Sequence, residues 1–361
     1  SSVFEDEVKV RLELVSDESL IYEDAETDPF TGEYASELQT ALDEVIGDDA
    51  YDIGHLFDYG QPDGDAGCIG CVCESGLKGS GYSTHPFRDI FGGEYRNDYF
   101  DLDYAAHEIG HQFGAFHSFS FDSEGTGFNA EPGSGSTIMA YAGICAPNVQ
   151  SNSDDHFHGI SLEEMSNFVT NGGNCAAIIS TANDPPTANA GSDYSIPVST
   201  PFELTGSATD PNGDSVSYCW EQMDNEVATM PPVSTNTGGP AFRTYDPSED
   251  SIRYFPKLND IVNGIDDDWE ELPSVSREMN FRVTVRDNHM GGGCTTEDDV
   301  NLIFNEAAGP FLVQNPNSAL TWLIGTTETV TWDVAATDVA PVSCSNVDIL
   351  LSTDAGTTWS T

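Results

Sequence analysis

Three histidines, a glutamate and a glycine between positions 107 and 117 have the types and spacing of a metal site. Residues four apart on an α-helix lie on nearly one face, so the imidazoles of His107 and His111 can reach the same ion. His117 would point elsewhere if the helix continued. We therefore expect the chain to turn back at Gly114, where a left-handed residue is tolerated. Three neutral imidazoles with one open position are typical of a catalytic zinc site, and Glu108 can act beside it as a base.

The complete pattern, H-E-x-x-H-x-x-G-x-x-H, resembles the signature of the metzincin zinc peptidases. The segment Ser136-Thr137-Ile138-Met139-Ala140-Tyr141 is similar to the Met-turn that these enzymes place beneath the zinc. The resemblance covers about residues 36–180 and is greatest to bacterial reprolysin-like (adamalysin-type) peptidases. It implies three zinc ligands, a catalytic glutamate and a packing methionine. These residues are His107, His111, His117, Glu108 and Met139.

Two positions leave details of this resemblance open. Ser118 follows the third histidine, where adamalysin-type members carry Asp and matrixins and pappalysins carry Ser or Thr. Tyr141 stands two positions after Met139, as in astacins and serralysins. It is either a further ligand that swings to hydrogen-bond the oxyanion, or a tyrosine of the pocket wall or core.

The resemblance also implies where a peptide substrate binds. A sheet edge would pair with an extended substrate backbone, and a pocket after the Met-turn would receive the residue that follows the cleaved bond. The alternatives are a core strand and an ordinary loop. The expected edge consists of Gly67, Cys68, Ile69 and Gly70, and the expected pocket of Ala142, Gly143 and Ile144.

The pattern of apolar residues predicts an α/β (α+β) catalytic domain over residues 1–182, with a twisted mixed sheet and an active-site helix. Strands are expected at 8–15, 51–57 and 68–73, and helices at 36–46 and 161–169. Asp101 or Asp103 is the expected N-cap of the active-site helix. Gly47 is expected to end the first helix.

Beyond Asn183-Asp184-Pro185-Pro186, the composition changes to short alternating strands with turn residues. Strands at 202–206, 216–220 and 281–285 predict an all-β immunoglobulin-like sandwich over residues 183–308. The stretch resembles a PKD module through Asp210-Pro211-Asn212-Gly213-Asp214 and the Tyr218-x-Trp220 pair. Residues 309–361 are expected to form a partial or small sandwich module with strands at 329–334 and 347–351.

Other polar clusters have two interpretations each. Residues 154–158, Asp-Asp-His-Phe-His, are either a second metal site or a surface loop that supports the zinc helix. Asp210, Asn212 and Asp214 offer oxygen ligands at alternate positions, so they form either a calcium loop or an Asx-rich turn. His55 and His85 are expected to be structural.

The eight cysteines predict disulfides rather than zinc fingers, because Cys68 and Cys71 form a single C-x-x-C unit without a partner unit. Five cysteines precede the linker, so at least one is free or pairs outside that region. The pairing there cannot be derived from the sequence. In the predicted sandwich of residues 183–308 we expect a Cys219–Cys294 disulfide.

The net charge is −51, from 11 basic and 62 acidic residues. This charge excludes nucleic acid and anionic membrane surfaces as partners. It is typical of proteins that stay soluble at high salt, so a marine, cold or saline habitat is expected. The first residue is Ser1, and no membrane-length apolar run is found, which predicts a mature secreted monomer without membrane insertion.

Together these features predict a secreted zinc endopeptidase that acts on protein or peptide substrates. One alternative is an adhesin or binding protein with an inactive metzincin-like domain, and another is an amidase or deacetylase that uses the same zinc. Zinc is the expected cofactor, and calcium is expected only if residues 210–214 bind it.

Overall fold

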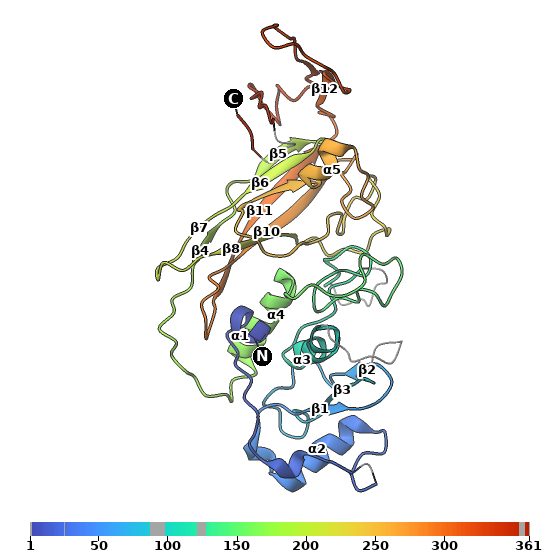
Figure 1. The fold of residues 1–361 in the computed structure, drawn as a ribbon, viewed down its shortest axis with the longest axis vertical. Coiled ribbons are helices and arrows are strands. Elements are labelled where there is room, and N and C mark those ends of the chain that lie inside the picture. The colour runs from blue at the N-terminus through green and yellow to red at the C-terminus, as the bar shows by residue number, and fades with distance from the viewer. Residues whose placement is uncertain (1, 25, 87–97, 121–127, 354–357, 361) are drawn as a thin grey trace.

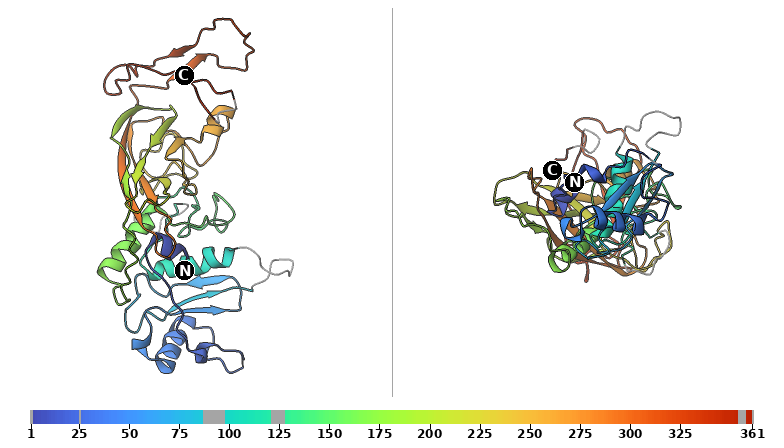
Figure 2. Two further views of the ribbon diagram at one scale, coloured as in Figure 1. Left: turned by 60° about the vertical axis from the view of Figure 1, so that its left-hand side comes forward. Right: turned by 90° about the horizontal axis from the view of Figure 1, so that it is seen from below.

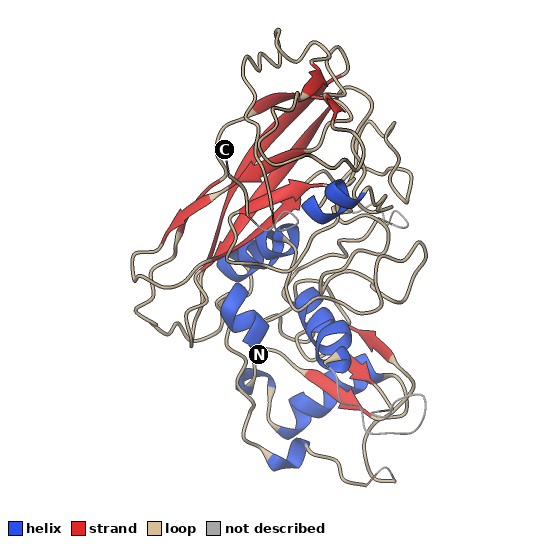
Figure 3. Cartoon of the chain, turned by 45° about the horizontal axis from the view of Figure 1, so that its top comes forward, coloured by secondary structure: helices blue, strands red, loops and turns tan. Residues whose placement is uncertain are grey.

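The computed structural model describes residues 2–24, 26–86, 98–120, 128–353 and 358–360. The chain forms an elongated molecule in which three regions follow one another along the long axis (Figures 1 and 2). Helices gather in the N-terminal region and at its junction with the middle region, whereas long strands dominate the middle region (Figure 3). None of the helices in the described residues is long and apolar enough to span a membrane.

The N-terminal region contains a small mixed sheet with helices on both faces. The strand order is β1-β3-β2, in which β3 runs parallel to β1 and antiparallel to β2. Strand β3 contacts both α2 and α3. The strands are β1 (His55–Asp58), β2 (Asp63–Asp65) and β3 (Gly81–Thr84). The helices are α1 (Ser2–Glu7), η1 (Glu18–Leu20), α2 (Tyr34–Val45), η2 (Asp48–Ala50), η3 (Phe100–Ala106), α3 (His107–Gln112) and α4 (Gly159–Asn171).

Two predicted helices are confirmed with small shifts at their ends. Helix α2 buries Leu38, Ala41 and Leu42 on one face, which is the apolar stripe seen in the sequence. Gly47 follows it with a φ of 86°, a conformation that glycine adopts without strain. Helix α4 covers the predicted 161–169 and extends two residues in each direction.

Two of the predicted strands are wrong. Residues 8–15 have no strand partner, and their alternation does not match burial, because Val8 is buried while Leu14 is 96% exposed. Residues 68–73 form turns. Gly70 in this segment and Gly67 just before it each have a φ of 69°, outside the extended range. The Cys68–Cys71 disulfide closes this short turn.

The core of this region joins distant parts of the chain. Phe4 of α1 packs against Phe113 and Phe157, with ring centroids 5.6 and 5.2 Å apart. Ile138 and Met139 complete this cluster and are fully buried. Burial of such side chains stabilises the fold by about 1.5–3 kcal/mol each.

The middle region is built on a four-stranded sheet with the order β5-β11-β10-β8. The β4–β7 and β6–β9 pairs accompany it. The strands predicted at 202–206, 216–220 and 281–285 are confirmed as parts of β6, β8 and β10. The elements are β4 (Thr187–Asn189), β5 (Tyr194–Pro197), β6 (Phe202–Thr205), β7 (Ser207–Thr209), β8 (Ser217–Gln222), β9 (Ile252–Phe255), α5 (Leu258–Asn263), β10 (Arg277–Arg286) and β11 (Thr295–Asn305).

The core of the middle region explains why these segments form strands. Along β10, Met279, Phe281, Val283 and Val285 are fully buried at alternate positions. This is the period of two expected when one face of a strand meets a core. Phe255 of β9 packs on Phe281 with ring centroids 4.9 Å apart.

The C-terminal region contains one antiparallel pair, β12 (Leu312–Asn315) with β13 (Thr331–Asp333). Strand β13 confirms part of the predicted 329–334. The strand predicted at 347–351 is not formed, and Leu351 makes only an isolated bridge to Ser360. Its apolar residues stay exposed because no core forms around them in the described residues.

The expected Cys219–Cys294 disulfide is wrong, and both thiols are free. Cys219 on β8 lies opposite Thr284 of β10. Cys294 precedes β11, which pairs with the other side of β10. Two strand spacings amount to about 9.5 Å, more than a disulfide can span. The second disulfide joins Cys73 to Cys175, and the predicted unpaired cysteine before the linker is Cys145.

Charged side chains connect the N-terminal and middle regions. Glu7 of α1 accepts a hydrogen bond from Arg286 Nε at 2.7 Å and another from the Phe157 amide at 2.8 Å. Arg282 contacts Glu163 of α4 at 2.8 Å. Helices α1 and α4 therefore lie against the end of the sheet that contains β8 and β10 (Figure 1).

Candidate metal centre

The helix that carries the first two histidines begins as a π-helix. Residues 100–106 form η3, and α3 continues directly from it. The predicted aspartate cap is wrong, because Asp101 and Asp103 lie inside η3 and its N-cap, Tyr99, makes no side-chain cap bond. Asp103 instead accepts a hydrogen bond from the Ser153 amide at 2.9 Å.

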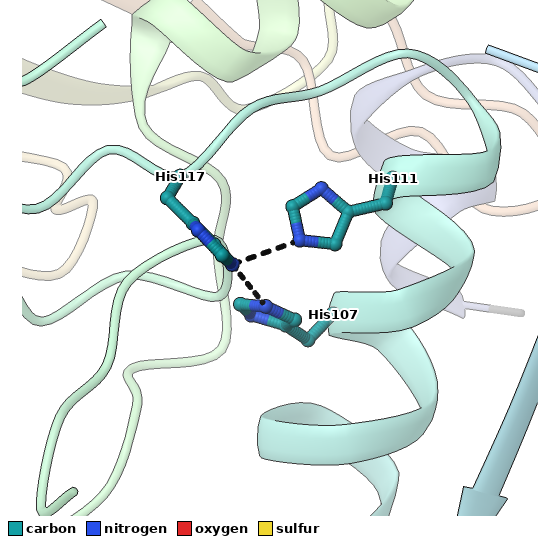
Figure 4. A group of neighbouring side chains, drawn as sticks. All are labelled: His107, His111 and His117. Atoms are coloured by element: carbon teal, nitrogen blue, oxygen red, sulfur yellow. Dashed lines mark hydrogen bonds between the residues drawn. The ribbon is translucent and has the colours of Figure 1, made fainter. Parts of the chain in front are cut away.

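The three histidine side chains meet as the motif predicts. His117 Nε2 lies 3.0 Å from His111 Nε2 and 3.2 Å from His107 Nε2 (Figure 4). His107 and His111 extend from α3, and His117 approaches from the loop that follows. One ligand atom from each histidine lies within 4.8 Å of the others. Such a cluster of nitrogen atoms can bind a metal ion.

Backbone carbonyls orient the two helical imidazoles. Nδ1 of His107 donates to the Ile138 carbonyl at 2.7 Å, and Nδ1 of His111 donates to the Ala115 carbonyl at 2.7 Å. These bonds place the proton on Nδ1 and leave the Nε2 lone pair for a metal. Burial, together with the neighbouring histidines, lowers the pKa of His107 well below its usual range and that of His111 to about 4. Both rings are therefore neutral, as ligands must be.

Gly114 makes the turn that brings His117 back. Its φ is 98°, and its amide donates to the His111 carbonyl at 2.8 Å. A methyl group at this position would also lie 3.0 Å from Phe168 Cβ. The sequence-based role of Gly114 is confirmed.

Met139 lies beneath the histidines as a packing residue. It is fully buried, and a methyl group at Gly110 would lie only 2.4 Å from its sulfur. The Met139 carbonyl accepts a hydrogen bond from the Ser118 amide at 3.1 Å. The turn is thus attached both to α3 and to the segment that follows His117.

Glu131 is a residue that the sequence analysis missed. It is buried, and its carboxylate accepts hydrogen bonds from Ser118 Oγ at 2.6 Å and from the amides of Ser136 and Thr137 at 2.7 and 3.1 Å. One carboxylate therefore connects the residue after the third ligand with the start of the Met-turn. No spacing rule in the sequence would have identified it.

Glu108 lies on α3 beside strand β2. A methyl group at Gly64 of β2 would lie 2.5 Å from Glu108 Oε1. The pKa of Glu108 is raised to about 8: burial is the main cause, the nearby Asp65 and Asp63 also raise it, and a hydrogen bond from the Ala66 amide lowers it. The carboxylate therefore binds a proton more readily than that of an exposed glutamate.

The sheet has two edges, β1 and β2, and neither lies at the predicted residues. Among the described strands, β2 has a neighbour on one side only. Gly70 instead donates its amide to the His111 carbonyl at 2.9 Å. The segment from Gly67 to Gly70 therefore supports the end of α3, and Cys68 in it is bonded to Cys71. Ile69 is about half exposed. Sequence analysis missed β2 because Asp63-Gly64-Asp65 has no apolar residue.

The tyrosine and the pocket residues lie after the Met-turn. The Tyr141 ring is 4.5 Å from the His117 ring and 5.5 Å from the His107 ring, measured between centroids. Ala142 is buried, Gly143 has a φ of 78°, and Ile144 is 52% exposed. Their roles in substrate binding stay predictions.

The remaining predicted polar groups have structural partners. Asp210 accepts the amides of Asn212 and Asp214 at 2.9 Å each, which is the Asx-turn alternative, and Asp214 pairs with His289 at 2.8 Å. His55 is structural, as predicted, with hydrogen bonds to Gln112 and Ser83 at 2.9 Å each. His85 packs against three aromatic rings, those of Tyr99, Phe100 and Tyr104.

Comparison with protein families agrees with this geometry. Residues 1–168 match the model of metallo-peptidase family M12B, reprolysin-like. The match includes the three histidines, Glu108 and Met139, and it ends within α4. We refer to residues 1–168 as the reprolysin-like region. No curated protein and no solved structure matches the chain.

Proposed function

We propose that the chain is a zinc-dependent endopeptidase. The observation that carries this proposal is the convergence of three imidazole nitrogens, with His117 Nε2 3.0 and 3.2 Å from the other two, beside a buried glutamate. Zinc favours nitrogen ligands of this kind, and a catalytic site keeps one position open. The match of the same residues to the reprolysin-like family supports the choice of metal.

Glu108 is the general base of the proposed reaction. A zinc ion held by the histidines would acidify a water molecule and polarise the carbonyl of the bond to be cleaved. Glu108 accepts a proton from the attacking water and later donates it to the leaving amine. Burial raises the pKa of Glu108 and so makes its carboxylate a stronger proton acceptor. Tyr141, whose ring contacts two of the ligand rings, is proposed to hydrogen-bond the oxyanion.

Strand β2 is proposed to bind the substrate backbone. Its unpaired side can accept an extended peptide as a further strand, which places the peptide beside Glu108. Ala142, Gly143 and Ile144 are proposed to line the pocket for the residue after the cleaved bond. The middle region is proposed to be an accessory immunoglobulin-like or PKD-type module, on the basis of its strands and core.

Secretion is proposed as well. The two disulfides are typical of proteins that fold in an oxidising compartment. The linker at residues 183–186 is the proposed boundary between the catalytic and accessory regions.

A chelator-reversible digest tests the proposed activity. Casein or a peptide library is incubated with the protein, with and without a zinc chelator, and products are read by mass spectrometry. We expect cleavage that stops with the chelator and returns with added zinc. His117→Ala should lose both zinc and cleavage. A protein that holds zinc but cleaves no peptide would contradict the proposal and favour the binding-protein alternative.

A further inference from the structure

His156 is a buried histidine without a hydrogen-bond partner. It lies between the Met-turn and α4 and is 1% exposed. Among the described residues, neither of its ring nitrogens has a hydrogen-bond partner. The surface-loop interpretation of residues 154–158 is therefore wrong for His156. A buried imidazole with two unsatisfied nitrogens is unfavourable unless something else binds it.

The middle region places two further metal-binding side chains beside this ring. Cys219 and Glu221 stand two positions apart on β8, so both point to the same face of the strand. Both are buried. One donor atom from each of His156, Cys219 and Glu221 lies within 4.8 Å of the others. The cluster thus joins a loop of the reprolysin-like region to a strand outside it.

The neighbours hold Glu221 in place for such a role. Its carboxylate accepts hydrogen bonds from the Gly159 amide at 2.9 Å and from Thr284 and Thr244 hydroxyls at 3.3 Å each. His158 Nε2 lies 3.8 Å from Glu221 Oε1. Nδ1 of His158 accepts the Ile160 amide, so its proton is on Nε2 and faces the carboxylate. His158 is therefore a supporting residue and not a fourth donor.

The junction carries charges of both signs. Arg286 is paired with Glu7 at 2.7 Å. Among the residues that the structure describes, Glu221 has no arginine or lysine partner within 4.0 Å. Burial raises the pKa of the Cys219 thiol and lowers that of His156 well below its usual range. The imidazole is thus neutral, and a bound ion would convert the thiol to a thiolate, as metal sites do.

We propose that His156, Cys219 and Glu221 bind a second transition-metal ion, which joins the reprolysin-like region to the middle region. One imidazole, one thiolate and one carboxylate form a donor set that suits zinc. Because the donors come from two regions of the chain, a bound ion would connect these regions. This site is independent of the three histidines of the proposed catalytic centre.

Cobalt substitution distinguishes the two sites. The metal-free full chain is titrated with Co²⁺, and bound metal is counted while the thiolate-to-cobalt absorption band is recorded. The histidine cluster contains no thiol, so a thiolate band must come from a site that contains one of the free cysteines. We expect two bound ions and a thiolate band for the native chain. We expect His117→Ala to lose one ion and keep the band.

Substitutions of the cysteine complete the test. Cys219→Ser should abolish the thiolate band and lose one ion, whereas Cys294→Ser, a change of another buried free thiol, should keep both. Cys145→Ser is expected to keep both as well. His156→Gln should weaken binding at this site at least tenfold without affecting the histidine cluster. A native chain that binds Co²⁺ without a thiolate band, or a band that survives Cys219→Ser, would overturn the proposal whether or not the variants fold.

Discussion

Backbone groups position each side chain of the proposed active site. The Ile138 and Ala115 carbonyls fix the tautomers of His107 and His111. Glu108 acquires its raised pKa because it is buried beside β2. The identities of these residues could be predicted from the motif alone. Their supports could not, since a carbonyl acceptor or a buried partner such as Glu131 leaves no pattern in the sequence.

Glu164 gives a test of pH dependence at the residue scale. Burial raises its pKa to about 8, one oxygen accepts a hydrogen bond from the Phe116 amide at 2.9 Å, and the other is buried without a hydrogen-bond partner among the described residues. The unfolded state ionises from about pH 4.5, so Glu164 destabilises the fold progressively as the pH rises towards 8. Glu164→Gln removes this effect. We expect the variant to gain about 1–2 kcal/mol relative to the native chain between pH 5 and 8.5.

Chemical denaturation at both pH values measures this difference. The native chain and Glu164→Gln are compared at each pH with the same buffer ions. A difference in stability that stays constant, or that shrinks as the pH rises, would contradict the assignment.

At the scale of elements, helices and core strands could be predicted, and irregular segments could not. The apolar stripe of α2 and the alternation along β10 reflect burial on one face. Residues 8–15 alternate as well, yet none of the described strands pairs with them. Strand β2 is defined only by its hydrogen bonds to β3. Strand pairing depends on residues distant in the sequence, which explains both errors.

The Gly114→Ala variant tests whether the turn after α3 sets the position of His117 in the metal site. Gly114→Ala forces a side chain into a left-handed conformation and against Phe168, and should destabilise the fold by about 1–3 kcal/mol. It should also weaken zinc binding at least tenfold by displacing His117. Gly47→Ala is the matched control, because Gly47 follows α2 with positive φ and has open space around it. Zinc titration of both variants decides the matter, and equal zinc affinities would contradict this role of Gly114.

At the scale of the whole molecule, the dominant property is a net charge of −51. The acidic residues are distributed along the chain, so they repel one another in the compact state. At the junction, by contrast, charges are paired, as in Glu7 with Arg286.

Salt should therefore stabilise the protein. The Debye length, over which charges repel one another in solution, falls from about 10 Å at 0.1 M to about 3 Å at 1 M ionic strength. We expect Tm to rise by about 5 °C or more between 0.1 and 1 M NaCl, measured by calorimetry on the metal-loaded protein. A Tm that falls over this range would show that paired charges outweigh the repulsion.

The reprolysin-like region should perform the chemistry by itself. Its core cluster lies entirely before the linker, and so do the three histidines and Glu108. A chain that ends at Asp184 should cleave short peptides with kcat/KM within about tenfold of the full chain, a difference of about 1.4 kcal/mol. Its Tm should be lower, because Glu7 loses Arg286. A truncated chain shown to be folded and zinc-loaded, yet inactive, would show that catalysis requires residues beyond Asp184.

The most direct test of the central claim is the kinetics of Glu108→Gln. The variant keeps the shape of the side chain and all three histidines but cannot accept the proton. We expect zinc content equal to that of the native chain and a fall in kcat/KM of about 10²–10⁴-fold on a peptide substrate. If the zinc-loaded variant cleaves peptides within about tenfold of the native rate, Glu108 is not the base and the account of the active site is wrong.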